Sequence, residues 1–172
     1  DIWVLDRQGR NEPLIQTHFD EMAPEFSPDG RWLAYTSNES GRDEVYVRPF
    51  PGPGHPIQVS TTGGQEPYWS PDGREILYTY PNLELKERAY YTAQIKVSGE
   101  KLRPDLPERL FGGTYTVRGP VRGFDVGPDG RMLLVKWDWL DIRTQEREDL
   151  APTHIELVTN WFQELRARVP VD

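Results

Sequence analysis

The chain has 172 residues, a net charge of −8 and no cysteine, with 36% apolar and 28% charged residues. This balance suits one soluble domain with a real core, and the chain has no apolar run long enough to span a membrane. The negative charge argues against a nucleic-acid partner, whose phosphates require a surplus of Lys and Arg, and the lack of cysteine excludes disulfides, thiol catalysis and thiolate metal sites.

Short runs of β-branched and aromatic residues, alternating with polar ones, predict strands along most of the chain. The predicted strands are Ile2–Leu5, Pro13–Gln16, Ala23–Ser27, Trp32–Ser37, Glu44–Arg48, Ile57–Ser60, Glu66–Ser70, Glu75–Tyr80, Ala89–Val97, Glu108–Phe111, Gly123–Gly127, Met132–Trp137 and Ile155–Thr159. The Pro- and Gly-rich segment 49–54 predicts a loop, and the polar insertions 81–87 and 139–152 predict projecting loops. Because Asp1 to Val4 resemble the middle of a strand, we expect the chain to be part of a longer protein.

A tetrapeptide turn recurs between these strands. Its Pro presets the turn, its Asp bonds to its own backbone, and its Gly adopts the left-handed conformation that closes a hairpin. We expect positive φ at the three glycines and interpret the aspartates as structural. The three copies of the turn centre on Pro28-Asp29-Gly30, Pro71-Asp72-Gly73 and Pro128-Asp129-Gly130.

The first two turns are 43 residues apart, and the third follows after 57. A period of about 40–45 residues is typical of a β-propeller blade. The sequence therefore predicts an all-β fragment of a propeller, with about three four-stranded antiparallel blades and a short C-terminal helix. The expected parts are a blade remnant over 1–17, blades over 18–61 and 62–112, a last blade over 113–160, and a helix over 160–169 that begins with a capping box at Asn160 and Gln163.

These segments resemble the TolB-like, WD-type propeller repeats found at the C-terminus of bacterial eukaryotic-like serine/threonine protein kinases. The resemblance rests on Asp1–Trp3, Phe26–Ser37, Glu39–Arg42, Glu44–Gly52, Val59–Ser60, Phe124–Val126 and Asn160–Leu165. It implies a sensor or docking domain, favours a periplasmic or other extracytoplasmic location, and does not imply the kinase itself.

The sequence contains no recognisable catalytic or cofactor motif. The phosphate-binding loop, the kinase signatures and the Gly-x-Ser-x-Gly nucleophile elbow are all missing. His18, His55 and His154 are far apart in sequence, and the acidic insertion that includes Asp138 and Asp141 lacks the pattern of a calcium loop. We therefore expect no catalytic residue, no metal and no cofactor.

The leading hypothesis is a non-catalytic module that binds a protein or peptide partner, or a small ligand, through its loops. Glu21, Glu66 and Arg122 lead into the inner strands and are the candidates to line the mouth of a central channel. The rival hypotheses are the propeller part of a hydrolase, peptidase or lyase, and a purely structural role in assembly.

A fragment of about three blades does not close a ring by itself. We therefore expect a homodimer of half-propellers that covers two open blade faces. These faces would be lined by apolar residues that include Trp32, Leu33, Trp69, Leu133 and Trp137.

Overall fold

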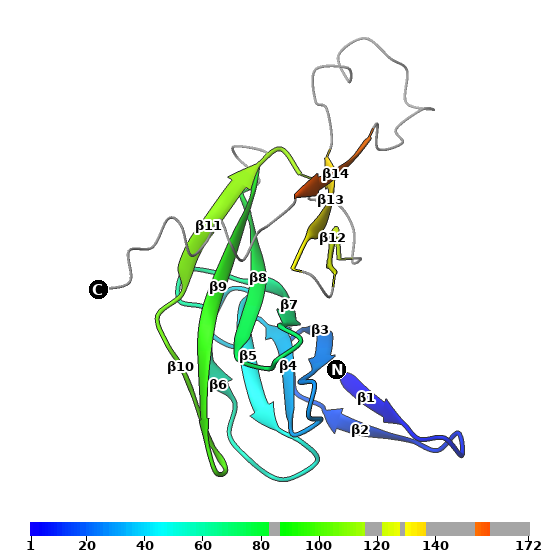
Figure 1. The fold of residues 1–172 in the computed structure, drawn as a ribbon. Helices are drawn as coiled ribbons and strands as arrows, with labels where there is room; N and C mark the ends of the chain where they lie inside the picture. The colour runs from blue at the N-terminus through cyan, green and yellow to red at the C-terminus, as the bar shows by residue number, and fades with distance from the viewer. Residues whose placement is uncertain (83–86, 116–121, 128–129, 137–153, 159–172) are drawn as a thin grey trace. The chain divides into compact units, whose positions relative to one another are not determined.

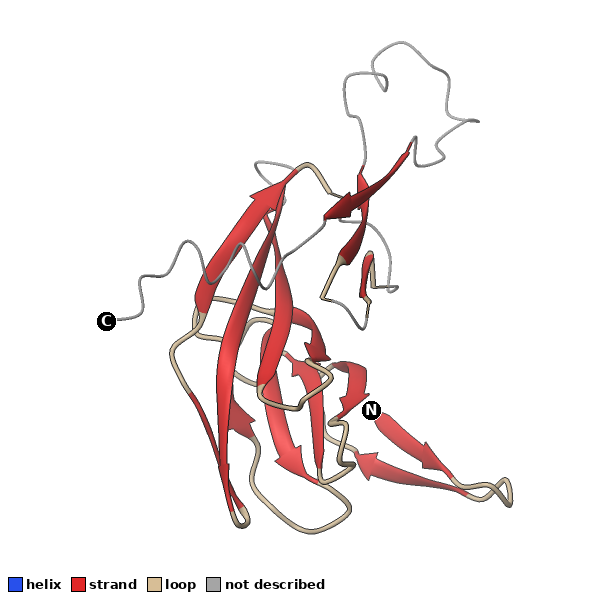
Figure 2. Cartoon of the chain, in the orientation of Figure 1, coloured by secondary structure: helices blue, strands red, loops and turns tan. Residues whose placement is uncertain are grey.

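The computed structural model describes residues 1–82, 87–115, 122–127, 130–136 and 154–158. Every regular element in these residues is a β-strand (Figure 2), so the all-β fold class is confirmed. The predicted helix over 160–169 lies outside the described residues. The chain divides into two compact units, one of residues Asp1–Tyr80 and Tyr90–Arg109, the other of Pro81–Ala89 and Leu110–Asp172.

The strands form four separate antiparallel sheets that follow one another along the sequence, as expected of successive blades (Figure 1). Strands β1 (Ile2–Leu5) and β2 (Asn11–Ile15) form a hairpin. The next sheet has the order β3-β4-β5-β6, from Glu21–Phe26, Trp32–Ser37, Glu44–Pro49 and Ile57–Gln58. The last sheet comprises β12 (Phe124–Val126), β13 (Met132–Lys136) and β14 (His154–Val158).

The second blade differs from the prediction by one additional strand. Its sheet runs β7-β8-β9-β10, from Gln65–Trp69, Glu75–Asn82, Glu87–Ser98 and Lys101–Pro104, and β11 (Glu108–Gly113) also pairs with β9. The sequence prediction had assigned the fourth strand to residues 108–111 and had missed β10. The missed hairpin turns at Gly99, whose φ is 62°, so that β10 folds back along the end of β9.

The recurrent turns have the predicted conformation. The values of φ are 69° at Gly30, 69° at Gly73 and 79° at Gly130. Each glycine N–H donates to the carbonyl three residues before it, over 2.8 Å to Ser27, 2.9 Å to Ser70 and 2.9 Å to Gly127. The prediction for the three glycines is therefore confirmed, whereas Pro128 and Asp129 lie outside the described residues.

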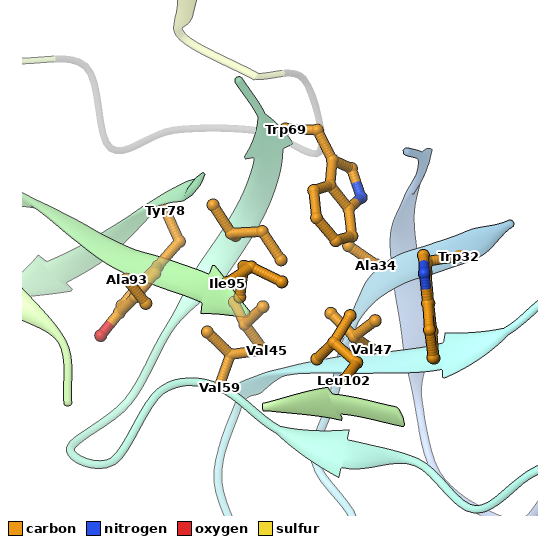
Figure 3. Close-up of a cluster of buried hydrophobic side chains, with 11 residues drawn as sticks. Trp32, Ala34, Val45, Val47, Val59, Trp69, Tyr78, Ala93, Ile95 and Leu102 are labelled. Atoms are coloured by element: carbon orange, nitrogen blue, oxygen red, sulfur yellow. The ribbon is translucent and has the colours of Figure 1, made fainter. Parts of the chain in front are cut away.

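The core of the first unit lies between the two complete blades. Strands β3 and β4 contact β7 of the next blade, and every residue of β4 is buried. Figure 3 shows the main cluster, to which both blades contribute. Its fully buried aliphatic side chains each contribute roughly 1.5–3 kcal/mol to stability. The cluster consists of Trp32, Ala34, Val45, Val47, Val59, Trp69, Ile76, Tyr78, Ala93, Ile95 and Leu102.

The expected lining of an open blade face requires correction. Trp32, Leu33 and Trp69 are 3%, 1% and 3% exposed. Trp32 is covered because Ile95 and Leu102 of the β9–β10 hairpin belong to the same cluster. Leu133 is exposed as expected, and Trp137 lies outside the described residues.

Candidate functional site

Glu21 and Glu66 lie at the starts of two neighbouring inner strands. Glu21 is the first residue of β3 and Glu66 the second of β7, and these two strands contact each other. Both residues are 8% exposed. The hydroxyl of Thr17 donates to Oε1 of Glu21. This carboxylate is therefore held by the segment that leads into β3.

Glu66 is held by threonines of both blades. Its N–H donates to Oγ1 of Thr36 over 3.2 Å, and the hydroxyl of Thr79 lies 3.4 Å from its Oε2. These contacts give Glu66 an architectural role at the boundary between the blades. Contact of Glu21 or Glu66 with a ligand at a channel mouth stays a prediction.

Arg122, the third candidate, belongs to the second unit. Its guanidinium carbon lies 5.5 Å from the centre of the Phe124 ring, and its Nη2 lies 3.9 Å from Oδ1 of Asp125. These are local contacts with the strand that follows it. Its place at a channel mouth also stays a prediction.

The most deeply buried carboxylate, Glu44, has an architectural role. It accepts hydrogen bonds from Nε of Arg42 over 2.7 Å, from the N–H of Gly63 over 3.0 Å and from the hydroxyl of Ser60. Because its oxygens accept these hydrogen bonds, the buried carboxylate avoids the cost of burial without partners. Glu44 thereby ties β5 to the loop that leads into β7.

A pocket of about 1070 Å³ lies in the first unit, between the β5–β6 loop and the β9–β10 hairpin. Both segments lie at the lower end of the view in Figure 1. The sequence pattern does not predict this pocket. Its lining comprises Arg31, Trp32, Pro49, Phe50, Gly52, Pro53, Gly54, His55, Ile57, Lys96, Ser98, Glu100, Lys101, Leu102 and Arg103.

The pocket combines an apolar lining with a positive wall. Pro49, Phe50, Pro53 and Ile57 supply accessible apolar surface, and Glu100 is the single carboxylate of the lining. Trp32 and Leu102 also line the pocket but are buried. The cationic residues of the lining are Arg31, Lys96, Lys101 and Arg103. This excess of positive charge contrasts with the net charge of −8 of the whole chain.

Two of the four cations have partners within the fold. Nη2 of Arg31 donates to the carbonyl of Gly99 over 2.6 Å, which ties the first blade to the tip of the hairpin. Nζ of Lys96 lies 2.7 Å from a carboxylate oxygen of Asp105. Lys101 and Arg103 are exposed and have no hydrogen-bond or ion-pair partner among the described residues.

The lining also contains the hydroxyl of Ser98 and the imidazole of His55. In the described part of the chain no hydrogen bond joins these two side chains. Among the described residues there is also no group of three or more His, Cys, Asp or Glu side chains that could hold a metal ion. No helix in those residues has the length and apolar character to cross a membrane.

The signal for this pocket was present in the sequence but weak. Ser98-Gly99 is a hairpin turn, and Lys101 and Arg103 alternate with Leu102 as in a short strand. The pocket is formed by two segments that are about 45 residues apart in the chain. A tight turn in one segment does not predict that the other segment will lie against it.

Comparisons with known proteins give short matches, and no family model matches the chain. The chain is 36% identical over 61 residues to the Tol-Pal system protein TolB of Hydrogenovibrio crunogenus, a match that covers 35% of this chain and 14% of that protein. It is 33% identical over 82 residues to the uncharacterized peptidase YuxL of Bacillus subtilis, over 45% of this chain and 12% of the relative.

Among solved structures, the chain is similar to a TolB from Agrobacterium tumefaciens at 21% identity and a TM-score of 0.49, over 66% of this chain and 42% of that one. TolB from Acinetobacter baumannii matches at 17% identity and a TM-score of 0.48, over 77% and 42%. The chain thus spans less than half the length of these relatives. The sequence match to TolB over 61 residues agrees with the TolB-like resemblance, whereas the kinase context stays a prediction.

Proposed function

We propose that this chain is a non-catalytic recognition module that binds a protein or peptide partner, or a small ligand. The observation that carries the proposal is the pocket between the β5–β6 loop and the β9–β10 hairpin, with its apolar lining and its four cations. Pockets that combine apolar surface with a few placed polar groups are typical ligand sites. The hairpin wall contributes Ile95 and Leu102 to the buried cluster of Figure 3, and Ile57, at the end of the β5–β6 loop, packs against that cluster.

A blocked pocket tests this function. Ser98 is exposed and lines the pocket, so Ser98→Trp adds bulk there with little effect on the core. A thermal-shift screen of defined peptides and metabolites, followed by calorimetry, is expected to find a ligand that binds the wild type but not Ser98→Trp. Gln8→Trp, on the distant and exposed β1–β2 turn, is the matched control and is expected to bind normally. A ligand that binds all three proteins equally would place recognition elsewhere.

The second candidate is the propeller part of a peptidase, another hydrolase or a lyase, with the active site elsewhere in a longer chain. The observation in its favour is the similarity to YuxL, which is named as a peptidase. Peptidase and esterase assays on the full-length gene product test it. Turnover that requires a domain beyond these 172 residues would support it, and turnover lost on substitution of His55 would locate catalysis in this chain.

The biological setting that we propose is a larger bacterial signalling or transport-associated protein that acts outside the cytoplasm. Its support is the similarity to TolB, named as a protein of the Tol-Pal system. A kinase domain upstream of the propeller is the finer form of this proposal. The full-length gene sequence tests it directly, and fractionation of cells that produce the tagged protein tests the location.

We also propose that two half-propellers form a homodimer. The apolar residues that support this proposal differ from those expected from the sequence. Trp32, Leu33 and Trp69 are buried and do not support the dimer. The support for the dimer is a set of other apolar side chains of the first unit that are exposed. Light scattering coupled to size exclusion is expected to give twice the chain mass of 19.9 kDa. A mass of one chain at micromolar concentration would refute the dimer. The exposed apolar residues concerned are Trp3, Leu5, Met22 and Phe26.

A further inference from the structure

We infer that the pocket between the β5–β6 loop and the β9–β10 hairpin selects an extended acidic peptide, with carboxylates at alternate positions. The inference rests on the proposed function and names the ligand of its site. Four observations carry it: the row of cations, the repulsion among them, the spacing along β10 and the size of the pocket.

The cations are aligned along one face of the hairpin. In the register of β9 and β10, Arg103 lies directly opposite Lys96 and Lys101 lies opposite Ser98. Residues directly opposite each other, and residues two apart in a strand, share a face of the sheet. All four of these residues line the pocket. The hairpin therefore presents three positive charges and one hydroxyl on the same face.

This arrangement is electrostatically unfavourable in the free protein. Like charges directly opposite each other in a β-ladder destabilise it, and Arg103 faces Lys96 in this way. Asp105 compensates Lys96, but no described carboxylate pairs with Arg103 or Lys101. A ligand that brings its own carboxylates would remove the repulsion and form new ion pairs, so the pocket favours an anion.

Spacing and size favour a peptide over a small anion. Lys101 and Arg103 are two residues apart in a strand, or about 7 Å, which is also the separation of side chains at alternate positions of an extended peptide. At about 1070 Å³, the pocket is at the upper limit of the range of roughly 300–1,000 Å³ for small-molecule sites. Its apolar surface at Phe50 and Pro53 suits the apolar residues between the two carboxylates.

An architectural explanation competes with this inference. Strand β10 ends its sheet, and Lys, Arg and Pro on an edge strand prevent edge-to-edge association. In that case the cations would be needed for solubility and would bind no ligand. The two explanations differ in what removal of Lys101 and Arg103 does to peptide affinity, which is the basis of the test.

The test is fluorescence anisotropy with a labelled peptide of alternating glutamate and leucine, and with the same peptide carrying glutamine for glutamate. The acidic peptide is expected to bind the wild type, and binding is expected to weaken on the order of tenfold in the double variant Lys101→Gln, Arg103→Gln. The matched control replaces Arg7 and Arg109, two exposed arginines outside the pocket, with Gln and alters the net charge equally. It is expected to change affinity by less than about twofold, as remote charges are screened by salt.

Each alternative result overturns the inference in a recognisable way. Equal binding of the neutral and acidic peptides would refute selection by charge. It would still agree with the proposed function, a module that binds peptides. Binding of glutarate by calorimetry without binding of the acidic peptide would assign the pocket to small anions. Unchanged affinity in the double variant, or a failure of the acidic peptide to bind, would leave the cations with the edge-protecting role, and the Ser98→Trp screen would still decide the proposed function.

Discussion

Ala23 of β3 and Glu66 of β7 occupy the same position in successive repeats, and both have a left-handed backbone conformation, with φ of 51° and 54°. The ladder slips at the same place in both blades, between Met22 and Glu25 in one and between Gln65 and Tyr68 in the other. The bulge is therefore a property of the repeat. It bends each inner strand where the two candidate glutamates lie.

A glycine at this bulge is expected to relieve strain. A non-glycine residue in the left-handed region costs about 1 kcal/mol or more, so Ala23→Gly is expected to leave the free energy of unfolding unchanged or to raise it by up to about 1 kcal/mol. The control is Ala34→Gly, in the buried and regular strand β4, where a loss of about 1 kcal/mol or more is expected. Urea denaturation measures both. Equal destabilisation by the two substitutions would contradict strain at Ala23.

The first turn is expected to make stability depend on pH. The hydroxyl of Ser27 donates to Oδ1 of Asp29 over 2.6 Å and accepts the N–H of Trp32 over 3.0 Å. The Ser27 hydrogen bond, with that from the N–H of Arg31, lowers the pKa of Asp29 below its ordinary value of 3.8. Because the folded-state pKa is the lower one, the carboxylate stabilises the fold above pH 3.8, and this contribution is lost as the pH falls through the lowered pKa.

Ser27→Ala is expected to cost about 1–2 kcal/mol near neutral pH, and progressively less as the pH falls below 3.8 towards the lowered pKa of Asp29. Urea denaturation at pH 7 and pH 3 measures the difference. The control, Ser98→Ala at an exposed serine, is expected to show no such dependence. A cost of Ser27→Ala that is the same at both pH values would refute the role of the ionised Asp29.

Loss of the Glu44 carboxylate is expected to destabilise the first unit strongly. Glu44→Gln leaves at least one of the donors from Arg42, Ser60 and Gly63 without an acceptor, at a cost of about 2–4 kcal/mol. Asp105→Asn, which alters the exposed ion pair with Lys96, is the control and is expected to cost less than about 1 kcal/mol. Thermal and urea unfolding measure the loss of stability in both variants. Similar losses would show that the hydrogen bonds of Glu44 contribute little to stability.

Gly63 is expected to tolerate no side chain. Its φ is 107°, and an added Cβ would lie 2.3 Å from Cε2 of Tyr80. Gly63→Ala is therefore expected to cost more than about 2 kcal/mol, whereas Gly30→Ala, which meets open space, is expected to cost only the backbone strain of about 1–2 kcal/mol. In a Tyr80→Ala background the additional cost of Gly63→Ala should fall to that of Gly30→Ala. If it does not, the ring of Tyr80 is not the obstacle.

Local signals in the sequence were sufficient for the turns and for most of the strands. The left-handed glycines at 30, 73 and 130 follow from turn chemistry, and the fully buried β4 follows from a run of apolar and small residues. Strand β10 was missed because it has only four residues, two of which are charged. Charged residues at alternate positions of a short edge strand resemble a polar loop when no partner strand is known.

Tertiary packing explains the remaining differences. The apolar character of Trp32 was evident, but the strands that cover it are more than 60 residues further along the chain, at Ile95 and Leu102. The pocket likewise depends on two segments that meet only in the folded unit. The sequence places Glu21 and Glu66 at the starts of inner strands, but it does not predict that both side chains are buried.

The most direct test of the account is a map of ligand binding on the ¹⁵N-labelled protein by NMR, with the acidic peptide added in steps. The account predicts that the largest shifts occur in the backbone amides of Phe50, Gly99, Lys101 and Arg103, around the pocket. It also predicts that the amides of Glu21 and Glu66 stay unchanged. Saturable shifts confined to Glu21, Glu66 and Arg122 would place recognition at a channel mouth and would contradict the assignment of the pocket as the binding site.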